Sequence, residues 1–221
     1  MTGIAFSVLS QAWKDKNLVK VLSVYKKTAL NLLIAGFAMM GLLILNIDNI
    51  IVFLGPRYES MIQVVLILGF SKLIDLGTGL NSHLLLTSKH WRIEFFTNIF
   101  LVIMAGVFNY LLVRRYGIIG SAWATFIAFS VYNSVRFFLI WKLFKMQPFD
   151  MNNVKIIIIA LLSFFAVKII PAIPNLYLDV LMRSILFTGL YGFILLRLTI
   201  SKDVNDFFKI AVTRLISFLK L

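Results

Sequence analysis

The chain has 221 residues, of which 61% are hydrophobic and 14% are charged, and its formal net charge is +13. Soluble domains contain about 45–50% apolar and about 25% charged residues, so this composition excludes an ordinary water-soluble protein. The Lys and Arg residues lie between long apolar runs, which is typical of the cytoplasmic face of a membrane protein and not of a nucleic-acid-binding surface. The chain has no cysteine, which excludes disulfides, iron–sulfur clusters and thiolate zinc sites within it.

The N-terminal segment, residues 1–27, carries five lysines and one aspartate between short apolar stretches. It lacks the small-residue cleavage site that ends a signal peptide. We therefore expect residues 1–27 to form an amphipathic lead-in on the cytoplasmic side.

Six apolar segments follow, and each meets or nearly meets the length of about 20 residues that a helix needs to cross a bilayer. In chain order they cover residues 28–54, 60–87, 95–113, 118–141, 154–170 and 178–198. The connections between them are short. The sequence thus predicts an all-α integral membrane protein, with a bundle of six transmembrane helices over residues 28–200.

The distribution of Lys and Arg predicts the orientation of the bundle, because positive residues are held on the cytoplasmic side during insertion. With the N-terminus inside, 15 Lys and Arg residues fall on the inner side, whereas the outer connections hold only Arg57, Arg114 and Arg115. Both termini should therefore be cytoplasmic, in a multi-pass protein of the cell inner membrane.

The C-terminal segment, residues 201–221, has apolar residues at helical spacing and is too charged to span a bilayer. The apolar stripe consists of Val204, Phe207, Phe208, Ala211, Val212, Leu215 and Ile216. We expect this tail to form an amphipathic helix along the inner membrane surface.

Lys72 and Asp75 lie near the middle of the second predicted span, where a charged side chain costs about 2.5–3.5 kcal/mol. Their spacing of three residues places both on one helix face. One interpretation is a substrate or coupling-ion site facing the bundle interior or water. The other is a neutralising ion pair that merely permits insertion.

A second polar stripe runs along the fourth predicted span and includes Asn133 and Arg136. Arg136 is a candidate ligand for an anionic group. It also lies about 10 Å from the cytoplasmic end of the span, close enough for its side chain to extend to the membrane surface instead.

Nothing in the sequence indicates bond-making chemistry, so we expect no catalytic residues, no metal site and no cofactor. The two histidines have no third ligand nearby, and no phosphate-binding glycine motif is present. An enzyme acting on polyprenyl diphosphates would need clustered carboxylates to hold its metal, whereas the predicted inner loops are basic.

Several short segments occur in a characteristic order and spacing. They are Tyr25-Lys26-Lys27, Leu54-Gly55-Pro56-Arg57-Tyr58, Asp75-Leu76-Gly77-Thr78-Gly79-Leu80-Asn81, Asn109-Tyr110-Leu111-Leu112, Tyr116-Gly117-Ile118-Ile119-Gly120-Ser121-Ala122 and Gln147-Pro148-Phe149. Together they resemble the C-terminal half of bacterial polysaccharide biosynthesis flippases, in the multidrug/oligosaccharidyl-lipid/polysaccharide exporter superfamily. The resemblance covers about residues 7–149.

The resemblance implies one half of a two-bundle, MATE-like fold whose cavity opens alternately to either side. It also implies a flippase that moves polyprenyl-diphosphate-linked oligosaccharide across the inner membrane for polysaccharide or lipopolysaccharide biosynthesis. By motif position, the residues expected toward that cavity are Lys72, Asp75, Asn81 and Arg136, with Asn133 beside Arg136 on the same stripe. The implied partners are membrane lipids and an N-terminal six-helix bundle of the same or a partner chain, and no nucleic acid.

Other functions remain open at this point. A drug/cation antiporter of the same superfamily would use intramembrane carboxylates, of which Asp75 is the deep one in the predicted spans. A non-transporting membrane scaffold or a subunit of a polyisoprenyl-handling enzyme is a further alternative. Because a lone bundle would expose Lys72 and Asp75 to lipid, we expect the chain to be a fragment of a longer protein rather than a separate half-transporter.

Overall fold

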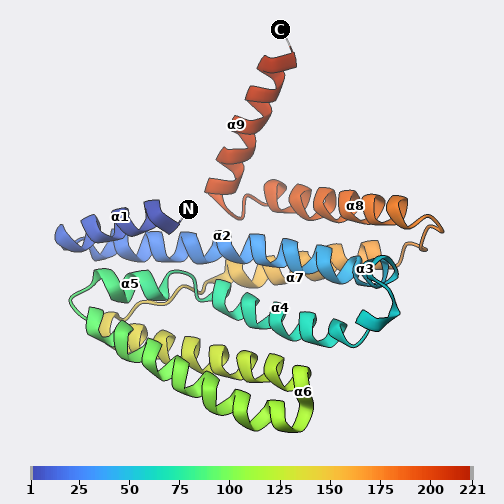
Figure 1. Cartoon of the computed structure of the whole chain (residues 1–221). Helices are drawn as coiled ribbons and strands as arrows, with labels where there is room; N and C mark the ends of the chain where they lie inside the picture. The colour runs from blue at the N-terminus through green and yellow to red at the C-terminus, as the bar shows by residue number, and fades with distance from the viewer. Residues whose placement is uncertain (1, 220–221) are drawn as a thin grey trace.

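The structure is a computed structural model that describes the backbone of residues 2–219 and the side chains of residues 6–210, 213 and 214. Within these residues the chain is helical and contains no strand. The helices are α1 (Thr2–Lys14), α2 (Leu18–Leu45), α3 (Ile47–Leu54), the short 3-10 helix η1 (Pro56–Tyr58), α4 (Met61–Gly77), α5 (Asn81–Thr87), α6 (Trp91–Phe144), α7 (Met151–Lys168), α8 (Leu176–Arg197) and α9 (Lys202–Leu219). Figure 1 shows that α2, α4, both halves of α6, α7 and α8 run roughly alongside one another.

The first long helix begins within the segment expected to be a lead-in. α2 starts at Leu18, where the Asn17 side chain accepts a hydrogen bond from the Lys20 backbone N–H at 2.9 Å. Lysines are good helix formers, so Lys20, Lys26 and Lys27 interrupt the hydropathy of this segment without ending the helix. α1 then folds back on α2 and buries Leu9 in a core cluster with α2 and α5.

The segment expected as a second continuous span is bent. α4 and α5 meet at an angle of 41° across residues 78–80. Gly79 adopts a φ of 67°, and a Cβ atom there would lie 2.8 Å from the Cβ of Ala29 on α2. Glycine is therefore needed both for the left-handed backbone and for the close approach to α2.

The segments expected as the third and fourth spans form one hairpin, α6, without a loop between them. Gly117, with φ 57° and ψ −137°, is the non-helical position at which the chain reverses. Figure 1 shows the two arms lying side by side in opposite directions. A Cβ atom on Gly120 would lie 2.1 Å from the carbonyl oxygen of Leu112, so the arms touch backbone to backbone near the turn.

α7 and α8 pack on α2 and complete the main apolar core. Phe187 and Tyr191 of α8 stack at 5.6 Å between ring centroids, and the Tyr191 hydroxyl donates to the Ile34 carbonyl at 3.1 Å. In the first turn of α8, Asp179 accepts hydrogen bonds from Arg183 and Asn49 at 2.7 Å each. The buried charges at this end of the bundle are thus neutralised within the fold.

α9 leaves the bundle and points away from it, across the direction of α8 (Figure 1). This direction is compatible with the expected surface helix. The side chains of Ala211, Val212, Leu215 and Ile216, which belong to the predicted apolar stripe, lie outside the described residues, as does the structure of residues 220–221.

Four helices of the described chain are long and apolar enough to cross a membrane, namely α2, α6, α7 and α8, and the bent pair α4 and α5 would make a fifth. Many large apolar side chains on them are exposed, among them Val102 at 71% and Leu162 at 61%. The chain is therefore an all-helical protein suited to embedding in a membrane. The expected count of six spans stays a prediction. It is reached only if each arm of α6 crosses the membrane separately.

Candidate functional site between helices α4 and α6

Lys72 and Asp75 form an ion pair on α4, with 2.6 Å between Lys72 Nζ and Asp75 Oδ2. The Lys72 side chain is 66% exposed and that of Asp75 is 28% exposed. The pair therefore lies on an open side of the chain, on a helix that belongs to a candidate membrane span. Charges placed in this way need water, a ligand or another protein surface beside them.

Two polar side chains connect this pair to the second arm of α6. The Asn133 amide nitrogen lies 3.5 Å from Asp75 Oδ1 and donates to the Phe129 carbonyl at 3.0 Å. The Thr78 hydroxyl lies 2.9 Å from the Asp75 carbonyl oxygen and 3.1 Å from Asn133 Oδ1. Asn133 is almost fully buried, at 1% exposure, so it is fixed between α4 and α6.

Arg136 is buried between the two arms of α6 and is paired with Glu94 of the first arm. Glu94 Oε1 also accepts hydrogen bonds from the Ser82 hydroxyl at 2.6 Å and from the Asn98 amide at 3.1 Å. The Arg136 guanidinium carbon lies 4.1 Å from the centroid of the Tyr132 ring, a cation–π distance. Arg136 therefore points into the hairpin and does not extend to the surface.

The Glu94–Arg136 pair is one of three polar contacts across the hairpin. The Tyr132 hydroxyl donates to Asn98 Oδ1 at 2.7 Å, and the Ser121 hydroxyl donates to Asn109 Oδ1 at 2.8 Å. All three pairs are symmetric about residue 115, as the register of two antiparallel arms requires. Polar contacts thus run along the apolar hairpin from its turn to its open end.

Asn133 connects the α4 pair to the arm that carries Arg136. Its amide nitrogen lies near Asp75, and it precedes Arg136 by three residues, so Asn133 and Arg136 lie on one face of that arm. Within the described chain, Glu94 Oε2 and Arg136 Nε are buried without a hydrogen-bond partner. Two cations, two carboxylates and spare buried hydrogen-bonding capacity are therefore gathered between α4 and α6.

Asn81, the fifth residue singled out from the sequence, makes a different contact. Its Oδ1 accepts a hydrogen bond from the Tyr25 hydroxyl of α2, and the residue is 2% exposed. Tyr25 belongs to the core cluster formed with α1 and α5. The structure therefore brings Lys72, Asp75 and Asn133 together, places Arg136 one contact further on, and joins Asn81 to the core.

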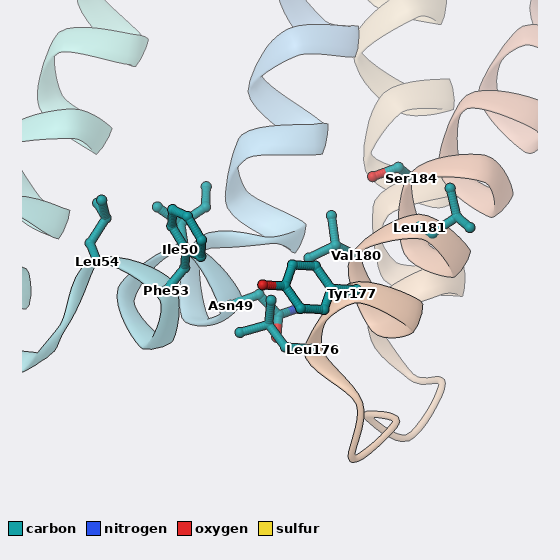
Figure 2. Close-up of a pocket in the computed structure, with 9 residues that line it drawn as sticks. All are labelled: Asn49, Ile50, Phe53, Leu54, Leu176, Tyr177, Val180, Leu181 and Ser184. Carbon is teal, nitrogen blue, oxygen red and sulfur yellow. The ribbon is translucent and has the colours of Figure 1, made fainter.

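An apolar pocket of about 430 Å³ lies between α3 and α8 (Figure 2). Its lining comprises Asn49, Ile50, Phe53, Leu54, Leu176, Tyr177, Val180, Leu181 and Ser184. None of the residues singled out from the sequence as substrate-binding lines this pocket.

The residues described by the structure contain no group of three or more His, Asp or Glu side chains placed to hold a metal ion. At the candidate site between α4 and α6, Lys72 and Arg136 are the positively charged groups.

Sequence reasoning missed Glu94, which directly precedes the predicted third span, residues 95–113. One signal was available, since Glu94 is the only acidic residue between Asp75 and Asp150 in the sequence. A buried Arg136 needs a carboxylate partner, and no other lies in that part of the chain.

No protein-family model, curated protein or solved structure matches the chain.

Proposed function

We propose that this chain is one half of a membrane transporter that moves lipid-diphosphate-linked oligosaccharides across the bacterial inner membrane by alternating access. The observation that carries the proposal is the exposed Lys72–Asp75 pair on a membrane-span face, next to the buried Glu94–Arg136 pair. Charges at membrane depth are costly, rare and usually line a substrate or ion pathway.

The proposed substrate matches the chemistry of these groups. A diphosphate carries negative charge. Lys72 can contact it from its exposed position, and the buried Arg136 can add to the attraction. Sugar hydroxyls both donate and accept hydrogen bonds, as the side-chain amide of Asn133 does. Asn81 would take part only after its hydrogen bond to Tyr25 had opened.

The other half of the transporter would cover the open face of α4. In this arrangement α2 with α3, α4 with α5, the two arms of α6, α7 and α8 make six crossings, with both termini in the cytoplasm. A second six-helix bundle of the same or a partner chain would then place Lys72 and Asp75 in a cavity between the bundles, as in a MATE-like fold. Rocking of the two bundles would expose that cavity to either side in turn.

Export of glycan by the intact protein, with its second bundle present, tests the proposal through Lys72. We expect Lys72→Ala to insert and accumulate normally but to lower export roughly tenfold or more, since a hydrogen bond to a charged group contributes about 1.5–3 kcal/mol. Lys168→Ala is a matched control, because Lys168 also pairs with an aspartate, Asp48, at 3.7 Å. That control should export normally.

The double variant Lys72→Ala with Asp75→Ala separates binding from charge balance. It leaves no lone charge on α4, so we expect it to accumulate to the wild-type level while export remains lost. Export at the wild-type rate from this double variant would mean that the pair only permits insertion, and the proposed site would be abandoned.

A drug/cation antiporter is the second candidate, and the burial of Glu94 favours it. Antiport needs buried carboxylates that exchange an ion for the substrate, and the chain offers Glu94, in the first turn of α6, together with Asp75. Transport by the purified protein in vesicles under an imposed proton or sodium gradient distinguishes the two functions. If Glu94→Gln abolishes gradient-driven efflux of cationic drugs that the wild type performs, the antiporter is correct and the flippase is not.

A further inference from the structure

A groove with a volume of about 1010 Å³ lies in the angle between α8 and α9. Its lining is mostly apolar and includes Phe193 of α8 and Phe207 and Phe208 of α9. All three phenylalanines are at least 50% exposed. Among the described residues, none covers these rings.

The groove is held open by hydrogen bonds that fix the start of α9 on the bundle. The Asn31 amide of α2 donates to Asp203 at 2.9 Å, and the same side chain accepts from the Ser201 hydroxyl at 2.6 Å. The Asn205 amide lies 3.3 Å from the Leu196 carbonyl oxygen. These hydrogen bonds therefore fix the angle between α8 and α9.

Two glycines form the floor of the groove. Gly189 and Gly192 are three residues apart, so they lie on one face of α8, and a Cβ atom on either would meet nothing within 4 Å. From Ser184 to Arg197 the floor runs along α8 for about 20 Å, at 1.5 Å per residue. One leaflet of a hydrocarbon core of about 30 Å is roughly 15 Å deep. The groove is thus long enough to hold an acyl chain across a single leaflet.

Positive charge marks one end of the groove. Arg197, at the last turn of α8, is the one charged residue among the described residues that line it. Lys202 begins α9 nearby, and Asp203 is occupied by its hydrogen bond from Asn31. An apolar groove that is long enough for one leaflet and ends at a basic group is complementary to an acyl chain with an anionic headgroup.

We propose that this groove is a binding site for an anionic phospholipid of the leaflet at the Arg197 end. One acyl chain lies over Gly189 and Gly192 beside the phenylalanines, and the phosphate contacts Arg197. The bound lipid fills the angle between α8 and α9 and holds α9 at the membrane surface. This site is separate from the charged residues of α4 and α6.

The binding of phosphatidylglycerol to the purified intact protein, measured against phosphatidylcholine by native mass spectrometry and by the shift in Tm, tests the proposal. The wild type should bind phosphatidylglycerol preferentially. Arg197→Gln should bind it about fivefold more weakly, since a basic residue near an anionic surface contributes about 1 kcal/mol. Gly192→Leu should fill the groove and lose the preference and the Tm shift.

Gly106→Leu is the matched control, because Gly106 of α6 also has nothing within 4 Å of a Cβ position. It should keep the lipid preference and the Tm shift of the wild type. Three outcomes would overturn the proposal: equal binding of the two lipids by the wild type, an equal loss in Gly106→Leu, or a change in oligomeric state caused by Gly192→Leu. The last would show that a second copy of the chain occupies the groove.

Discussion

Glu94 and Arg136, which are 42 positions apart in the sequence, meet as a buried ion pair across the α6 hairpin, with both side chains less than 8% exposed. Each arm of the hairpin thereby supplies one of the two charges of the pair. The pair lies close to the polar site beside α4, because Asn133, three residues before Arg136 on the same arm, contacts Asp75.

Replacing only one residue of this pair should destabilise the protein. Arg136→Leu or Glu94→Leu alone leaves a buried charge without its partner, and we expect each to destabilise the protein by about 3–5 kcal/mol. The double variant should recover most of that loss. Thermal unfolding in detergent measures all three, and a double variant no more stable than either single variant would contradict the coupling.

The close approach of the two arms predicts a second effect. Gly120→Ala places a methyl group 2.1 Å from the Leu112 carbonyl oxygen, so the arms must separate, at a cost of about 1–3 kcal/mol. Gly106→Ala, in open space on the same helix, should be neutral or slightly stabilising. Unfolding midpoints of both variants check the contrast, which would vanish if the arms did not touch near Gly117.

Topology provides a third prediction. Cysteines placed one at a time at Lys89, Lys145 and Ser201 should react with reagents from the cytoplasmic side, and cysteines at Arg57, Arg115 and Asn175 from the periplasmic side. The chain contains no native cysteine to confuse the readout. A reversed pattern at any two of these sites would rule out the six-span arrangement.

The attachment of α9 supplies the fourth prediction. Asn31→Ala removes two hydrogen bonds, to Asp203 and from Ser201, so α9 should detach more often and be cut faster by protease. Gln11→Ala is the control, because the Gln11 amide bonds to Asp15 of the same segment. Equal cleavage rates in wild type and Asn31→Ala would show that other contacts hold α9.

Part of this architecture could be predicted from the sequence, and the rest depends on contacts that hydropathy does not encode. The spacing of Lys72 and Asp75 placed them on one helix face, where they form an ion pair. The partner of Arg136 depends on the register of two arms that meet 42 positions apart, and the rotation of each arm is set by packing. The apolar pattern likewise gave no sign that Asn81 bonds to Tyr25.

The tight reversal at Gly117 bears on how the protein reaches its membrane. No hydrophilic loop separates the arms of α6, and Arg114 and Arg115 lie exposed at the tip. In the six-span arrangement these two guanidinium groups must be carried through the bilayer, since neither arm can stop at an intermediate loop. The arms should therefore enter together, as one preformed unit whose combined apolar surface drives the arginines across during biosynthesis.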